Sequence, residues 1–233
     1  MCLWQKINKV NAPLKTVVIL LVASICFGQQ RGIVLEPGGY VGQEMKNRPR
    51  DGQLWMGLCP KDGAYQWIKA PVHVLHAHDS NDIDGVDTHI SFAGCAQPVL
   101  LQKGLNVPVM RPIVTTLSKA DGSLQIGAPL QLKFESHIYT LKIVSPQSDG
   151  IAAGSQLVFD DGEHQQVLFT CAANCNSPSW ELLWAGDADF DGKLDLYINA
   201  SNHYAAGNHM LLLSSLKNGT LLGKFGAVTF PVS

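Results

Sequence analysis

The sequence predicts an all-β fold, an antiparallel sandwich or barrel-like structure made of one or two small β domains. Between residues 54 and 171, short apolar or alternating runs recur, and turn signals rich in Gly, Asp and Pro separate them. Strands that follow one another every 8–12 residues or so are typical of antiparallel sandwiches and barrels. No run in this stretch has the 3.6-residue spacing of an amphipathic helix.

Turn signals between the predicted strands indicate that they form hairpins. Lys61-Asp62-Gly63 separates the first pair of runs, and Asp160-Asp161-Gly162 separates the last pair. The runs are residues 54–59, 65–77, 89–92, 98–101, 107–117, 130–134, 138–144, 156–159 and 165–171.

The first 28 residues have the pattern of an export signal. Three lysines, Lys6, Lys9 and Lys15, precede an apolar run over residues 17–27, and small residues lie near its end. The run is shorter than the roughly 20 residues that a membrane-spanning helix needs. We therefore expect cleavage between Gly28 and Arg31, a secreted or periplasmic protein, and no membrane span in the mature chain.

Three further regions are expected after the signal. Residues 29–52 contain several breakers and no strand periodicity, which predicts a linker or leader. Residues 53–118 form an N-terminal β region, and residues 119–233 form a C-terminal β region that contains an acidic loop. The seam between the two regions is placed near residues 117–122.

Composition argues against a nucleic-acid partner and against a disordered chain. Loss of residues 1–28 leaves 14 Lys and Arg against 19 Asp and Glu, a formal charge of −5. Such an acidic surplus does not suit a phosphate backbone or an acidic membrane surface. The apolar content of 46% is sufficient for a packed core.

Four cysteines remain after the signal: Cys59, Cys95, Cys171 and Cys175. An even number in an exported chain favours disulfides. Three pairings are open, and we favour Cys59 with Cys95 and Cys171 with Cys175. A four-cysteine zinc site would need two short pairs, and the sequence has one.

The acidic loop at residues 187–195 has the spacing of a calcium site. It reads Asp-Ala-Asp-Phe-Asp-Gly-Lys-Leu-Asp, with carboxylates at positions one, three, five and nine and glycine at position six. Calcium takes six to eight oxygen ligands, and alternating carboxylates supply them when the backbone curls around the ion. The predicted ligands are Asp187, Asp189, Asp191, the carbonyl of Lys193, and Asp195.

This loop resembles the calcium loop of FG-GAP and VCBS repeats. Their pattern, Asp-x-Asp-x-Asp-Gly-x-x-Asp followed by an apolar residue, is matched from Asp187 to Leu196. It differs from an EF-hand because position twelve is Ile198 and because a strand-like alternation follows. The resemblance covers about residues 180–219 and implies Ca²⁺ bound between two strands, without implying an activity. The chain as a whole resembles exported bacterial proteins that carry a single repeat of this kind.

A second cluster suggests a different metal. His73, His76 and His78, followed by Asp79 and Asp82, supply the nitrogen and oxygen ligands that zinc takes, with His76 and His78 on one face of a strand. A metal-dependent zinc hydrolase is therefore the alternative function. Exposed histidines on an edge strand explain the same pattern, and the spacing departs from the His-x-His-x-Asp-His motif of zinc hydrolases.

The sequence thus favours a calcium-binding module of the cell envelope or extracellular space over an enzyme. No nucleophile elbow or glycine-rich phosphate loop is present. Polar and aromatic residues after the acidic loop would suit a carbohydrate or protein ligand; they are Asn202, His203, Tyr204, Asn208 and His209.

Overall fold

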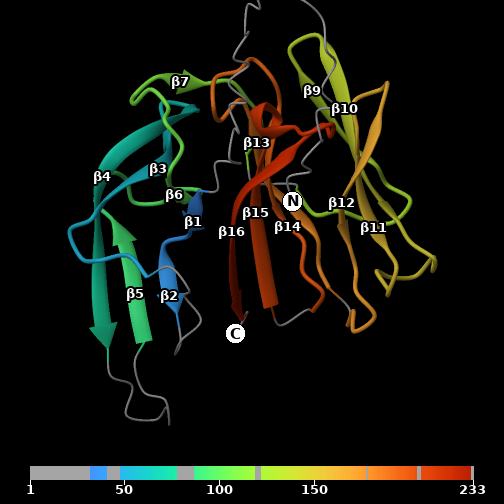
Figure 1. Cartoon of the computed structure of the whole chain (residues 1–233), viewed down its shortest axis with the longest axis horizontal. Coiled ribbons are helices and arrows are strands. Elements are labelled where there is room, and N and C mark those ends of the chain that lie inside the picture. The colour runs from blue at the N-terminus through green and yellow to red at the C-terminus, as the bar shows by residue number, and fades with distance from the viewer. Residues whose placement is uncertain are drawn as a thin grey trace, which may run out of the picture.

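The computed structural model describes residues 32–40, 48–77, 87–118, 122–176, 178–203 and 206–231. In these ranges the chain forms sixteen strands, arranged in three antiparallel sheets, and one short 3-10 helix (Figure 1). The predicted all-β antiparallel fold is confirmed. The predicted export signal lies outside the described residues.

The first sheet has seven strands, of which β3 and β4 form its longest hairpin. Asp62 and Gly63 turn the chain between them with φ of 51° and 80°, the left-handed pair typical of a type I′ hairpin. In sheet order the strands are β1 (Ile33–Leu35), β6 (Leu101–Lys103), β3 (Leu54–Lys61), β4 (Ala64–Ala77), β5 (Asp87–Phe92) and β2 (Gly38–Tyr40), with β7 (Pro112–Ile113) paired to β4.

The second sheet is a four-stranded meander in which each strand pairs with the next one along the chain. Its strands are β9 (Leu130–Phe134), β10 (His137–Val144), β11 (Gln156–Asp160) and β12 (Gln165–Thr170). The predicted turn at residues 160–162 joins β11 to β12.

The third sheet has five strands and lies between the other two (Figure 1). In sheet order they are β16 (Gly223–Pro231), β15 (Ala206–Leu213), β14 (Asp195–Asn199), β13 (Glu181–Gly186) and β8 (Thr115–Ser118). The 3-10 helix η1 (Ser214–Leu216) follows β15 directly.

Both faces of this central sheet are buried, so the protein has two hydrophobic cores. Trp184 and Tyr197 of the central sheet pack with Trp67 of the first sheet in one core. Leu196 and Ile198 pack with the second sheet in the other core. Because neighbouring residues of β14 point to opposite faces of the sheet, successive side chains of this strand pack alternately into the two cores.

Residues 29–52, predicted to be a linker or leader, supply two strands instead. Val34 and Leu35 in β1 are fully buried in the core between the first and central sheets. The N–H of Gly32 donates to the carbonyl of Phe225 at 3.0 Å, which ties this segment to β16. Three-residue strands among glycines have no local pattern, because their pairing partners lie far along the chain.

The favoured disulfides are confirmed. Cys59 bonds to Cys95 with a Cα–Cα distance of 6.1 Å, and Cys171 bonds to Cys175 with a Cα–Cα distance of 5.6 Å. Such bonds persist in oxidising compartments. Within the described ranges, no helix has the length and apolar character needed to cross a membrane.

Candidate metal centre

The acidic loop joins two neighbouring strands of the central sheet. β13 ends at Gly186 and β14 begins at Asp195, and these two residues are register partners. Two residues in the loop have left-handed backbone, Phe190 with φ of 63° and Gly192 with φ of 81°. Gly192 adopts this conformation without steric cost, as the sharp turn predicted at position six requires.

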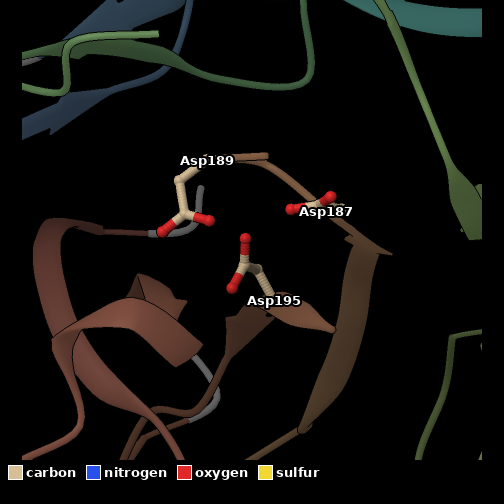
Figure 2. Close-up of side chains that lie close together, drawn as sticks. All are labelled: Asp187, Asp189 and Asp195. Carbon is tan, nitrogen blue, oxygen red and sulfur yellow. The ribbon is translucent and has the colours of Figure 1, made fainter. Parts of the chain in front are cut away.

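Three carboxylates of this loop converge. Asp187, Asp189 and Asp195 each offer one oxygen, and these oxygens all lie within 4.8 Å of one another. Figure 2 shows the three side chains pointing toward a shared space, two from the loop and one from the start of β14. Among the described residues, this is the group of His, Cys, Asp and Glu side chains that is arranged to hold a metal ion.

Asp195 is completely buried at the first position of β14. Its Oδ2 accepts a hydrogen bond from the N–H of Ala188 at 2.7 Å, and its Oδ1 accepts one from the N–H of Ser214 at 2.8 Å. Burial raises the pKa of this carboxyl well above its usual range, and the negative charge of Asp189 raises it further, whereas the two hydrogen bonds lower it. Its charge needs a compensating cation more than any other in the loop.

Asp187 and Asp189 are partly buried, and the curled backbone supports both. Asp187 accepts the N–H groups of Asp191 at 3.0 Å and Gly192 at 3.1 Å. Asp189 accepts the N–H of Asp191 at 3.3 Å and the hydroxyl of Ser215. Burial is the largest cause of the raised pKa of each carboxyl, and repulsion from neighbouring aspartates adds to it.

The other two predicted ligands lie outside the converging group. Asp191 is exposed, and its oxygens accept the N–H of Lys193 at 2.9 Å and the hydroxyl of Ser214 at 2.8 Å. Lys193 is exposed as well. Their roles as ligands, Asp191 through its side chain and Lys193 through its carbonyl, stay predictions.

Sequence reasoning missed two serines that contact the acidic residues. Ser214 and Ser215 come from η1, which begins 19 residues after the last residue of the loop, and their hydroxyls bond to Asp191 and Asp189. The chain brings them there because β15 pairs with β14 and η1 starts where β15 ends. Nothing in the sequence around this pair of serines indicates that they contact the acidic loop.

Two residues near the first sheet also hold the loop. The indole N–H of Trp67, in β4, donates to the carbonyl of Ala188 at 2.7 Å, and both residues are fully buried. The guanidinium carbon of Arg111 lies 4.7 Å from the ring centroid of Phe190. The loop is therefore fixed to the first sheet as well as to the central sheet.

The histidine cluster is only partly described. His73 and His76 lie in β4, opposite Ser91 and Thr88 of β5, and the odd spacing between them places them on opposite faces of the strand. Nδ1 of His73 lies 3.7 Å from Asp51, and Nδ1 of His76 lies 3.2 Å from the hydroxyl of Thr88.

The remaining members of the histidine cluster, His78, Asp79 and Asp82, lie outside the described residues. The two histidines of this cluster that the structure describes, His73 and His76, do not share a face of β4. The zinc-hydrolase alternative stays a prediction.

The polar residues after β14 mostly support the backbone. Asn202 accepts the N–H of Ala172 at 2.8 Å, and Asn208 donates to the carbonyl of Ala200 at 2.8 Å. Nδ1 of His209 lies 2.7 Å from Glu36. Tyr204 lies outside the described residues.

Comparison of the chain with protein-family models, with curated proteins and with solved structures finds no match of any kind. The resemblance to FG-GAP and VCBS repeats therefore stays a hypothesis based on the loop sequence.

Proposed function

We propose that this chain is an exported calcium-binding β protein that acts as a binding or structural module of the cell envelope or extracellular space. One observation carries the proposal, the convergence of the Asp187, Asp189 and Asp195 carboxylates within 4.8 Å. The bound ion would fix the loop to the layers on either side of it.

Electrostatics supports a cation at this position. Three carboxylates that crowd together and lose water repel one another, and the raised pKa of each one expresses this cost. A divalent cation among them replaces the repulsion with attraction. The folded state then gains the free energy of binding.

The donor atoms favour calcium among the divalent cations. The converging ligands are all carboxylate oxygens, which suit a hard cation, whereas zinc sites are usually built from Cys and His. Magnesium requires a small octahedral shell and keeps several of its waters. A loop that offers several carboxylates and backbone carbonyls suits the larger, more flexible shell of calcium.

The expected role of the ion is to rigidify the contacts that the acidic loop makes with η1 and with β4. Asp195 already links the loop to η1 through the N–H of Ser214, and Ala188 links it to β4 through Trp67. An ion held by Asp195 together with the two loop carboxylates would lock these contacts in one arrangement. Surfaces formed by the neighbouring loops would then be presented rigidly to a carbohydrate or protein ligand.

Calcium titration with thermal unfolding tests the proposal. Extracellular calcium modules commonly have dissociation constants of about 10⁻⁴–10⁻³ M, so millimolar calcium would stabilise the fold by on the order of 1 kcal/mol. We expect a rise of several degrees in Tm with calcium and a smaller rise with magnesium. Asp189→Ala should abolish the calcium-dependent rise and leave the calcium-free Tm nearly unchanged, because it also removes a source of repulsion.

The matched control is Asp149→Ala, which removes an exposed aspartate from the segment that follows β10. This variant should respond to calcium as the wild type does. An identical calcium response from Asp189→Ala and the wild type, across a titration to ten times the fitted dissociation constant, would show that the site is assigned wrongly.

A further inference from the structure

A second feature of the molecule is a cleft between the first sheet and the segment that follows β6. This segment, residues 104–110, is fastened at both ends. Near its start, the Gln102 amide donates to the carbonyl of Leu105 at 3.2 Å and accepts the N–H of Leu105 at 3.0 Å. At its end, the N–H of Met110 donates to the carbonyl of Trp67 at 2.9 Å.

The cleft beneath this segment has the size of a small-molecule site. Its volume is about 440 Å³, within the range of roughly 300–1,000 Å³ that is usual for ligand pockets. Met56 of β3 is the register partner of both Lys69 and Gln102, so the three side chains project side by side from one face. They lie on the sheet side of the cleft, and residues 104–107 and 109 line the other side.

Apolar side chains dominate the cleft and remain open to solvent. Leu54 and Met56 line it from β3, and Val107 and Val109 line it from the crossing segment. Leu54 is 53% exposed and Val109 is 50% exposed, which is high for side chains of this kind. Ligand-binding grooves are one of the places where exposed apolar residues gather, and these residues share one cleft.

The charged residues that line the cleft are both basic. They are Lys69 and Lys103, and no aspartate or glutamate lines it with them in the described part of the chain. Neither lysine forms an ion pair with another described residue. The cleft therefore carries local positive charge on a chain whose formal net charge is −2.

We propose that this cleft binds an amphipathic organic anion, a medium-chain aliphatic carboxylate. The hydrocarbon chain would lie along Leu54, Met56 and the two valines, where burial of apolar surface drives binding. The carboxylate would lie at the ammonium groups of Lys69 and Lys103. This site is separate from the acidic loop and does not depend on calcium.

Isothermal titration of decanoate into the mature protein tests this proposal. The buffer is free of calcium, because calcium forms poorly soluble salts with such acids, and the decanoate stays below its micelle concentration. We expect saturable binding of one molecule per chain. The double variant Lys69→Gln with Lys103→Gln should bind about tenfold more weakly, since each exposed ion pair contributes about two- to fivefold.

Two controls separate the cleft from general adsorption. Lys133→Gln removes an exposed lysine of β9, in the second sheet, and should leave the affinity unchanged. Decyltrimethylammonium has a similar tail and the opposite charge, so it should bind more weakly than decanoate to the wild type. Circular dichroism of the double variant should match that of the wild type, because both lysines are exposed.

The proposal is overturned if decanoate does not saturate, or if the double variant and the wild type bind it equally. Equal binding of the cationic amphiphile overturns it as well. None of these outcomes involves the acidic loop, so they leave the calcium proposal to its own test.

Discussion

Two buried polar residues in β14 lie two positions apart and are compensated in different ways. Asp195 is buried, which raises its pKa well above the usual range, and the N–H groups of Ala188 and Ser214 that it accepts offset part of that effect. The Tyr197 hydroxyl donates to Glu36 Oε1 at 2.5 Å, and burial, followed by the charge of Glu36, raises its pKa well above the usual range. The hydrogen bonds at Asp195 therefore reduce the cost of a buried negative charge without removing it, whereas the surroundings of Tyr197 favour the neutral hydroxyl.

Tyr40 gives a pH-dependent prediction at this scale. It is 4% exposed, and burial raises its pKa to about 12. Because the folded-state pKa exceeds the unfolded value of 10.0, the contribution of Tyr40 is complete below pH 10 and is lost as the pH rises toward 12. By pH 11 the loss should be on the order of 1 kcal/mol.

Urea unfolding of the wild type and Tyr40→Phe, at pH 7, 9, 10 and 11, measures this contribution. At pH 7 the variant should be less stable by about 1 kcal/mol, because the hydroxyl donates to the carbonyl of Glu36 at 2.7 Å. The difference should shrink above pH 10, where only the wild type has this group to titrate. A difference that stays constant from pH 7 to 11 would contradict the assignment.

The acidic loop was predictable because its aspartates are close together in the sequence. The alternating aspartates that begin at Asp187, together with Gly192, are enough to recognise the loop from consecutive residues. Three of the five predicted ligands converge in the structure. Ser214 and Trp67 were not predictable, because they reach the loop through strand pairing and layer packing rather than through sequence neighbours.

Strands were likewise predictable where their pairing partners are close in the sequence and were missed where the partners are distant. Hairpins with a two-residue turn, such as the one at Asp62-Gly63, have their pairing partners and turn chemistry adjacent in sequence, and they were predicted. β1 and β2 were missed because β1 pairs with β6 and β2 pairs with β5, each more than forty residues away. Three residues contain too few alternations to show a period.

Burial on both faces of the central sheet predicts a large difference between two isoleucines. Ile198 of β14 is completely buried between the central and second sheets, whereas Ile138 of β10 is 57% exposed. Ile198→Ala should lower the free energy of unfolding by about 2–5 kcal/mol, because it removes apolar contacts and leaves a cavity.

The same substitution at Ile138 serves as the matched control. Ile138→Ala should cost less than about 1 kcal/mol, since mostly the strand preference of isoleucine is lost. Both values come from chemical denaturation of the oxidised protein. Equal losses at the two positions would mean that the central sheet is not covered by the second sheet in solution.

The three-layer arrangement is the part of the fold that local sequence does not encode. Alternation along β14 is compatible with a sheet that has one apolar face and one polar face, yet Tyr197 and Leu196 are both fully buried in opposite cores. The first sheet covers one side of the central sheet, and the second sheet covers the other (Figure 1). The candidate metal centre lies where the central sheet meets the first sheet, because Trp67 bonds to the loop there.

This position makes the proposed calcium effect extend beyond the loop. Calcium should slow hydrogen exchange at the N–H groups of Ala188, Gly192 and Ser214, which all donate to ligand carboxylates. It should also slow exchange at the Trp67 indole, because opening of that bond requires the loop to move away from β4.

Measurement of hydrogen exchange by NMR, with and without calcium, distinguishes an effect that reaches the first sheet from one confined to the loop. Amides of Leu141 and Phe159, which are paired between β10 and β11 in the second sheet, report the change in global stability and supply the baseline. Slowing of the Trp67 indole beyond this baseline is the expected result, since the ion raises the cost of local opening in addition to that of unfolding. Slowing at the loop amides with the indole left at the baseline would mean that calcium orders the loop alone and leaves the two layers uncoupled.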